Sequence, residues 1–189
     1  MVSLTAFQRA VAAKDVSTER HVERVGILAR SLGRAAGVRG LDLENLVSGA
    51  LLHDVGKLYV PDSILGKRGP LTLEEQVVMQ SHTTRGEAML RSEGASVEIM
   101  AVARSHHEWW NGTGYPDRLA GFEIPFVARL VAVCDGFDAM TSERPYRAPL
   151  SVVQALEILE EGAGSQWDAG LVELFLGSSL RALGAIAVA

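Results

Sequence analysis

Five histidines are present in this chain, and each lies beside an acidic residue or another histidine, or on a helical face that suits metal binding. They are His21, His53, His82, His106 and His107. Histidines scattered over a surface would not be expected to follow such a pattern. A histidine set gathered at one site indicates a metal centre, and a metal centre usually performs chemistry.

The strongest local signal is the run His106-His107-Glu108. It ends an apolar helical segment and is followed directly by residues 111–125, which are rich in glycine and proline and must form a loop. Two adjacent histidines in that position are difficult to explain as core residues. A pair of surface histidines is the alternative interpretation.

His53 and Asp54 are adjacent, so on a regular helix their side chains would point about 100° apart. They can hold one ion only near a bend or a helix end, unless the carboxylate reaches sideways to bridge to a second ion. Gly56 supplies a bend just downstream. The alternative is a capped helix end with a hydrogen-bonded histidine.

Asp135 and Asp138 lie three residues apart on the most apolar helical segment of the chain. Both carboxylates therefore share one face of a helix that should be buried, and a buried carboxylate must be paired, protonated or bound to metal. The alternative is a salt bridge to one of the arginines Arg129, Arg144 and Arg147.

Together these residues offer five imidazoles and two or three carboxylates. That is too many donors for one ion with about four to six ligands, and it suits two ions. Imidazole and carboxylate without thiolate favour iron, manganese or zinc, whereas calcium prefers oxygen ligands alone. His21 and His82 lie on amphipathic helices, where each taken alone would be an ordinary histidine at a polar edge.

Cationic residues complete the pattern. Lys57 follows His53 by one helical turn and can sit over the metals, and Arg144 and Arg147 flank a Pro-Tyr pair soon after the two aspartates. Metal, lysine and arginine together provide the charge neutralisation, orientation and protonated group that phosphoryl chemistry needs. Solvated charge after a helix is the alternative for the two arginines.

Composition limits the class of protein. The chain has 189 residues, enough for one domain with a sizeable core, and its net charge of −5 argues against binding a DNA or RNA duplex through a broad basic face. The single cysteine, Cys134, lies in an apolar run, which indicates a buried thiol and fits a reducing cytoplasm. No segment reaches the roughly 18 apolar residues of a membrane span, and residues 1–16 lack a signal-peptide pattern. We therefore expect a cytoplasmic protein without membrane association.

The hydrophobic pattern is helical almost throughout and predicts an all-α fold. One domain is expected over residues 1–189, with an N-terminal helix or extension at 1–16 and a tail at 181–189. The first apolar stripe comprises Val22, Val25, Ile27, Leu28 and Leu32. Expected helix starts are an Asp42 N-cap, a Thr72–Glu75 capping box, Ser96, Pro125, Ser151 and an Asp168 cap. The capping-box helix is expected to carry His82, and the helix from Ser96 to reach Glu108.

These motifs closely resemble the HD-GYP domain, a branch of the HD phosphohydrolases. The resemblance is carried by Leu51-Leu52-His53-Asp54-Val55-Gly56-Lys57, and by His106-His107-Glu108 with Asn111-Gly112-Thr113-Gly114-Tyr115-Pro116. It continues through Asp135, Asp138-Ala139-Met140-Thr141 and Arg144-Pro145-Tyr146-Arg147, and runs from about His21 to Phe175. The combination is highly specific, whereas a bare His-Asp pair is not.

The resemblance implies a helical bundle with two or three metals, commonly iron or manganese. It also implies hydrolysis of cyclic di-GMP to pGpG and, in some members, on to GMP. Carried over, one metal is held by His21, His53, Asp54 and Asp135, and Asp54 bridges to a second metal held by His82, His106 and His107. Lys57 assists at the leaving oxygen or a phosphate, so Asp54 and Lys57 are the expected catalytic residues. Substrate phosphate is bound by Arg144 and Arg147, and the guanine pocket is lined by Gly114, Tyr115 and Pro116.

The chain departs from the family pattern at two places. Ser17 stands where members with three metals carry a glutamate, so two metals are expected. Trp109-Trp110-Asn111 replaces the usual Arg-Trp-Asp. A catalytically weak nucleotide-binding or protein-interaction module therefore stays open beside cyclic di-GMP hydrolysis, as does a phosphohydrolase for another nucleotide. Such domains usually follow a receiver or sensor domain, so an upstream sensor or receiver protein is an expected partner. The oligomeric state is left open, with a homodimer as one option.

Overall fold

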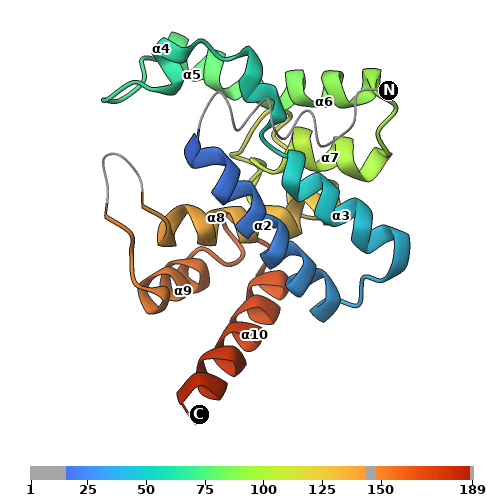
Figure 1. Cartoon of the computed structure of the whole chain (residues 1–189), viewed down its shortest axis with the longest axis vertical. Coiled ribbons are helices and arrows are strands. Elements are labelled where there is room, and N and C mark those ends of the chain that lie inside the picture. Colours follow the sequence, from blue (N-terminus) through green and yellow to red (C-terminus); the bar gives the residue numbers. More distant parts are fainter. Residues whose placement is uncertain (1–15, 144–147, 188–189) are drawn as a thin grey trace.

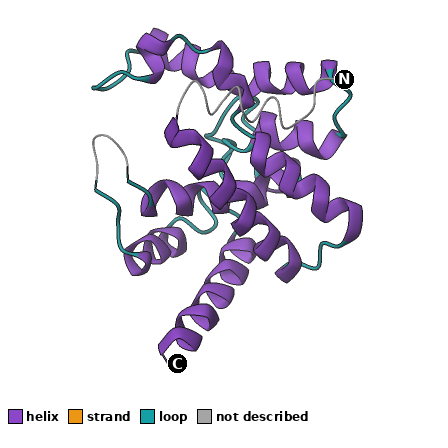
Figure 2. Ribbon diagram, in the orientation of Figure 1, coloured by secondary structure: helices purple, strands orange, loops and turns teal. Residues whose placement is uncertain are grey.

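The computed structural model describes residues 16–143 and 148–187, and these ranges contain helices and loops but no β-strand (Figures 1 and 2). The longer helices are α2 (Val16–Ala35), α3 (Gly40–Leu52), α5 (Leu73–Gln80), α6 (His82–Ser92), α7 (Val97–Ser105), α8 (Phe126–Thr141), α9 (Val152–Glu161) and α10 (Ala169–Ala187). Shorter turns are η1 (Val55–Tyr59), α4 (Asp62–Leu65) and η2 (Gly121–Glu123). The predicted all-α class is confirmed for the described residues.

Helix starts follow the local capping chemistry. Thr72 and Glu75 form the predicted capping box of α5. Ser96 accepts a hydrogen bond from the backbone N–H of Ile99 at the start of α7, and Ser151 caps α9. The Asp168 carboxylate accepts the N–H of Gly170 as α10 begins, as predicted.

The predicted start of α3 and the predicted end of the capping-box helix are wrong. Helix α3 begins at Gly40 with Arg39 as its N-cap, because a φ of 56° at Gly40 turns the chain before Asp42 is reached; Asp42 lies in the first turn instead. The capping-box helix ends at Gln80, so it does not carry His82. Ser81 donates its hydroxyl to the Val78 carbonyl, and a local bond of this kind competes with continuation of the helix.

The prediction that Ile27 belongs to the buried stripe of its helix is also wrong. Helix α2 buries Val22, Val25, Ala29 and Leu32, whereas Ile27 is 70% exposed. Two residues beyond Val25, Ile27 is rotated by about 200° and faces away from the core.

The interior consists of two hydrophobic clusters. The larger cluster joins α2, α3, α7, α8, α9 and α10, and the smaller cluster joins η1, α6 and the ends of α3 and α7. Helices α3 and α7 take part in both: Ala50 and Val102 belong to the larger cluster, and Leu52 and Ala103 to the smaller. Residues that directly follow α3 and α7 therefore emerge where the two clusters meet.

Helix α8 runs through the centre, and α10 projects away from it (Figure 1). Cys134 on α8 is a buried free thiol, as predicted, and burial raises the pKa of that thiol. Helix α8 ends at Thr141. At the C-terminal end the backbone stays helical to Ala187. Within the described residues, no helix is both long and apolar enough to cross a membrane.

Candidate metal centre

Five of the seven candidate ligands lie at or just beyond helix ends, where neighbouring side chains can point to one place, whereas His21 and Asp135 lie within α2 and α8. His53 is the C-cap of α3 and Asp54 precedes η1, so the bend predicted at this pair is present. His82 is the first residue of α6, and His106 is the C-cap of α7. The helix α7 ends at Ser105 rather than at Glu108 as expected, which leaves His106 and His107 in the turn that follows.

Gly56 is required for this arrangement. A Cβ atom at this position would lie 1.8 Å from the backbone oxygen of His82 and 2.6 Å from the nitrogen of Gly86. The turn after Asp54 therefore packs directly against the first turn of α6, and this brings Asp54 and His82 together.

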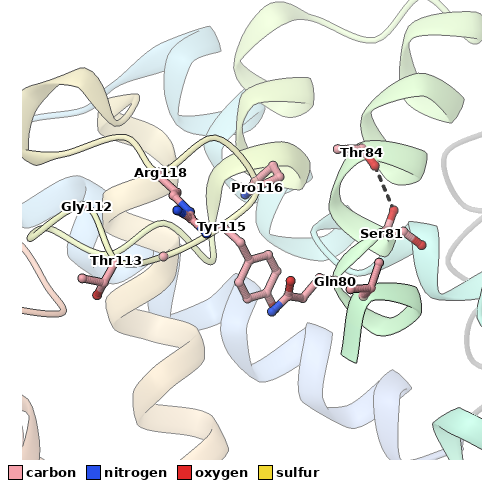
Figure 3. Close-up of a pocket in the computed structure, with 10 residues that line it drawn as sticks. Gln80, Ser81, Thr84, Gly112, Thr113, Tyr115, Pro116 and Arg118 are labelled. Atoms are coloured by element: carbon pink, nitrogen blue, oxygen red, sulfur yellow. Dashed lines mark hydrogen bonds between the residues drawn. The ribbon is translucent and has the colours of Figure 1, made fainter. Parts of the chain in front are cut away.

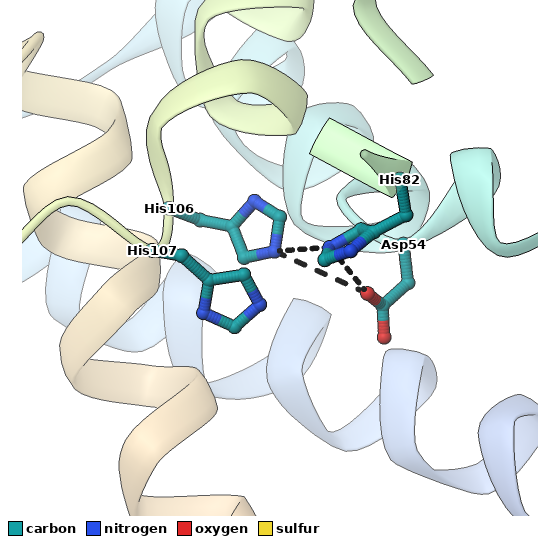
Figure 4. A group of neighbouring side chains, drawn as sticks. All are labelled: Asp54, His82, His106 and His107. Atoms are coloured by element: carbon teal, nitrogen blue, oxygen red, sulfur yellow. Dashed lines mark hydrogen bonds and ion pairs between the residues drawn. The ribbon is translucent and has the colours of Figure 1, made fainter. Parts of the chain in front are cut away.

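Asp54, His82, His106 and His107 form a first ligand cluster, with one donor atom of each lying within 4.8 Å of the others (Figure 4). The two Nε2 atoms of His82 and His106 are 3.4 Å apart, and Asp54 Oδ1 lies 3.4 Å from the first and 4.0 Å from the second. With metal–ligand bonds of about 2.1 Å, neighbouring ligands are spaced by about 3 to 4 Å. The spacing of the cluster fits one transition-metal ion.

The tautomers of the buried histidines also fit a metal. Nδ1 of His82 donates to the Met79 carbonyl and Nδ1 of His106 to the Val102 carbonyl, so each Nε2 presents a lone pair to the other. Burial lowers the pKa of both imidazoles and keeps them neutral. Two facing lone pairs repel each other unless a cation lies between them.

A second cluster contains His21, His53 and, again, Asp54. Nε2 of His53 lies 3.3 Å from Asp54 Oδ2, and its Nδ1 donates to the Ala50 carbonyl. Asp135 completes this side, because its Oδ1 is 3.2 Å from His21 Nε2 and 3.9 Å from His53 Nε2. The structure therefore brings all seven predicted ligands together in two groups that share one carboxylate.

Asp54 faces both clusters with different oxygens. Oδ2 lies toward His53 and accepts a hydrogen bond from Lys57 Nζ at 2.5 Å, whereas Oδ1 lies toward His82 and His106. Among the described residues, Asp54 Oδ1 is the buried side-chain polar atom without a hydrogen-bond partner. An unpartnered buried carboxylate oxygen is costly, and a cation at this position would remove the cost. The donor set therefore fits a dinuclear centre of the kind predicted.

Asp138 does not join the ligands but holds one of them. Its carboxylate accepts from His21 Nδ1 at 2.7 Å and from Arg24 at 2.5 and 2.9 Å. Burial opposes the charged form of His21, but its hydrogen bonds to Asp135 and Asp138 outweigh burial and raise the His21 pKa to about 9. The alternative salt bridge from this acidic pair to Arg129 is wrong, since Arg129 pairs with Asp168. Arg144 and Arg147 lie outside the described residues.

A cavity of about 630 Å³ adjoins the first cluster, between the α5–α6 junction and the loop after His107 (Figure 3). Its wall includes the predicted pocket residues Gly114, Tyr115 and Pro116. The Tyr115 ring stacks on His107, with centroids 4.8 Å apart. A side chain at position 114 would collide with the backbone of Trp109 and His107, so glycine is needed there.

A model of the HD domain matches residues 5–171 of this chain, which is most of its length. The chain belongs to the HD domain family. The family and fold class expected from the sequence are confirmed.

Relatives and solved structures agree with this assignment. The chain is 41% identical over 165 residues to a cyclic di-GMP phosphodiesterase of Thermotoga maritima, covering 86% of this chain and 45% of that protein. It is 38% identical over 169 residues to 3'3'-cGAMP-specific phosphodiesterase 2 of Vibrio cholerae, covering 88% and 32%. The chain thus spans less than half the length of these relatives. The phosphodiesterase PgpH HD domain of L. monocytogenes, solved with cyclic-di-AMP, has a TM-score of 0.69 at 17% identity over 96% of each chain.

Two residues that support the candidate metal centre were not assigned a role from the sequence. Arg24 reaches Asp138 across 114 positions of sequence. Glu108 is buried, and its two carboxylate oxygens accept the backbone N–H groups of Asp117 and Leu119 at 2.7 and 3.1 Å. Glu108 thus holds the loop that walls the cavity. The position of Glu108 directly after the two histidines is the sequence feature that could have indicated this supporting role.

The segment Trp109-Trp110-Asn111, where the HD-GYP pattern differs, is well anchored. The N–H groups of Trp110 and Asn111 donate to the carbonyls of Gln166 and Ser165. Asn111 Oδ1 accepts from both the N–H and the hydroxyl of Thr113, which forms a local turn. Asn111 therefore has a structural role in the loop that follows the neighbouring ligand cluster.

Proposed function

We propose that this HD domain is a metal-dependent phosphodiesterase that hydrolyses cyclic di-GMP to pGpG or GMP. One observation carries the proposal: two ligand clusters share Asp54 beside a cavity large enough for a nucleotide. The names of the relatives, cyclic di-GMP and 3'3'-cGAMP phosphodiesterases, support the same reaction class.

The proposed cofactor is a pair of divalent ions, iron or manganese, with zinc as the third option. His21, His53, Asp54 and Asp135 would hold one ion, and Asp54, His82, His106 and His107 the other. When bound, such ions lower the pKa of water to make a nucleophile at neutral pH and neutralise charge on the phosphate. Asp54 would join the two sites.

The protein's own cations would position the substrate. Lys57 Nζ lies 2.5 Å from Asp54 Oδ2 with its side chain 27% exposed, so it sits at the rim of the centre where a phosphate would approach. It would hydrogen-bond that phosphate or the leaving oxygen. Arg144 and Arg147 are proposed to bind substrate phosphate, and Gly114, Tyr115 and Pro116 to line the base pocket.

The proposed setting is second-messenger signalling in the bacterial cytoplasm, under an upstream sensor or receiver protein. A buried free thiol at Cys134 suits a reducing compartment. A homodimer is the oligomeric form that we propose to test first.

The test is to load the protein anaerobically with iron or manganese, measure the metal content, and incubate the same sample with cyclic di-GMP. We expect pGpG or GMP, and no product from the metal-free protein. Metal-loaded protein that yields no product over hours would overturn hydrolysis of this substrate.

Two rivals are separated by the same samples. Relatives specific for 3'3'-cGAMP favour a mixed cyclic dinucleotide as the competing substrate, and a substrate panel decides between them. Nucleotide binding measured by calorimetry without turnover would indicate a binding module instead.

A further inference from the structure

The cavity beside the first cluster is lined mainly by uncharged groups. The loop contributes Thr113 and Tyr115, and the α5–α6 junction contributes Gln80, Ser81 and Thr84. Of the ten described residues that line the cavity, one carries a charge, and that residue is Arg118 (Figure 3).

Arg118 has an unusual backbone. Its φ is 58°, and within the described ranges it is the sole residue other than glycine with a positive φ. A side chain is disfavoured in this left-handed region, where glycine is the default residue. A residue kept in such a conformation persists only when its surroundings hold it there, and such positions gather at functional sites.

The surroundings of Arg118 do hold it. Glu108 accepts the N–H groups of Asp117 and Leu119, the residues on either side. Arg104 binds both carboxylate oxygens of Asp117 at 2.7 and 2.8 Å. The Asp117 carboxylate is therefore already paired with Arg104. In the described part of the chain, no carboxylate pairs with the Arg118 guanidinium.

A phosphate site normally gathers several cations or a row of backbone N–H groups. This cavity instead offers one planar guanidinium among amide, hydroxyl and aromatic groups, and it is far larger than a phosphate. Guanine presents two acceptors, O6 and N7, to a guanidinium, whereas adenine replaces one of them with an amino donor that repels it. The lining therefore suits a purine with two acceptors on one edge.

We propose that Arg118 is a specificity-determining residue that donates two hydrogen bonds to the O6 and N7 edge of a guanine in this cavity. This rests on the proposed function, because the cavity opens beside the ligands His82 and His107 through Ser81 and Tyr115. The strained backbone at position 118 is then the means by which the loop presents a guanidinium to the base.

The experiment compares Arg118→Gly and Arg118→Gln with the wild-type protein on cyclic di-GMP and cyclic di-AMP. Glycine suits a φ of 58°, so Arg118→Gly is not expected to lower the melting temperature. We expect wild type to prefer cyclic di-GMP, and the ratio of the two kcat/KM values to fall on the order of 10- to 100-fold in both variants. Arg34→Gln is the matched control, because it removes the same charge. Arg34 is exposed and lies about 20 Å along α2 from His21.

Binding of GMP and AMP to the metal-loaded protein, measured by calorimetry, separates this inference from the proposed function. A selective loss of GMP affinity in the Arg118 variants supports the inference even if no cyclic dinucleotide is hydrolysed. An equal loss for guanine and adenine ligands, with a weaker salt dependence, would place the guanidinium on a phosphate and overturn base recognition. Unchanged selectivity in an active enzyme would overturn the inference and leave the phosphodiesterase proposal standing.

Discussion

The two ligand clusters share Asp54 but differ in charge and in origin. The first takes His82 from the start of α6 and His106 and His107 from the turn after α7. Burial lowers the pKa of each of these imidazoles, that of His107 to about 4. The second takes His21 from α2 and Asp135 from α8, where the raised pKa of His21 reflects its acidic partners.

This difference shows how each cluster behaves without metal. In the second cluster the His21 ring bonds Asp135 and Asp138, so its polar atoms already have partners. In the first cluster the lone pairs of His82 and His106 face each other, and Asp54 Oδ1 has no hydrogen bond. We infer that the first cluster gains more from a cation and binds the first equivalent of metal, whereas metal at the second must displace an internal ion pair.

The largest effect is expected from Asp54→Ala, which removes the carboxylate common to both clusters. Both ions should be lost and turnover should fall to background, because each site loses an oxygen ligand. Elemental analysis of the purified variant checks this. Asp42→Ala, at an exposed carboxylate in the first turn of α3, should keep both ions. Two ions retained by Asp54→Ala would sink the bridging role.

The next largest effect is expected from substitutions that remove a histidine from one cluster at a time. His106→Ala should abolish the tighter site and His21→Ala the weaker one, so each variant should bind one ion in place of two. Metal titration followed by calorimetry should lose its high-affinity phase in His106→Ala and its low-affinity phase in His21→Ala. Loss of the same phase in both variants would mean that the two clusters act as one site.

Much of this architecture could be predicted from the sequence because it depends on local signals. The ligand residue types, the bend after His53 and the capping box at Thr72 are all encoded within a few residues. The break at Ser81 was missed because the hydrophobic pattern continues from α5 into α6.

The supporting contacts could not be predicted, since they join distant segments. Nothing near Arg24 indicates that it meets Asp138, and nothing near Glu108 indicates that its oxygens bind N–H groups nine and eleven residues later. The approach of Asp54 to His82 depends on the close packing of η1 against the first turn of α6 at Gly56. Such features follow from tertiary packing rather than from spacing.

A smaller effect, confined to metal affinity at the second cluster, is expected from Asp138→Asn. The amide keeps the shape of the side chain but weakens its hold on His21 Nδ1, and loss of such a supporting carboxylate typically lowers metal affinity by about 10- to 100-fold. The weaker phase of the titration should shift while the tighter phase stays in place. Glu44→Gln is the matched control, because Glu44 pairs with Arg30 at the surface. A shift in the tighter phase would contradict the separation of the clusters.

The smallest effect is expected from Glu108→Gln, beside the first cluster. The amide oxygen can accept one of the two N–H groups that Glu108 now holds, and the amide nitrogen faces the other, so about 1 kcal/mol of stability should be lost. Part of the loss is offset, since burial raises the Glu108 pKa and the neutral amide avoids burying a charge. In a chain of this length that free energy lowers the melting temperature by about 2 to 4 °C.

The melting temperature is measured in the presence of a chelator, so that bound metal cannot mask the change. Glu44→Gln is again the control and is expected to leave the melting temperature nearly unchanged. Because Glu108 holds the loop rather than a ligand, both metal phases should persist; loss of the tighter phase would mean that the loop itself shapes the first cluster.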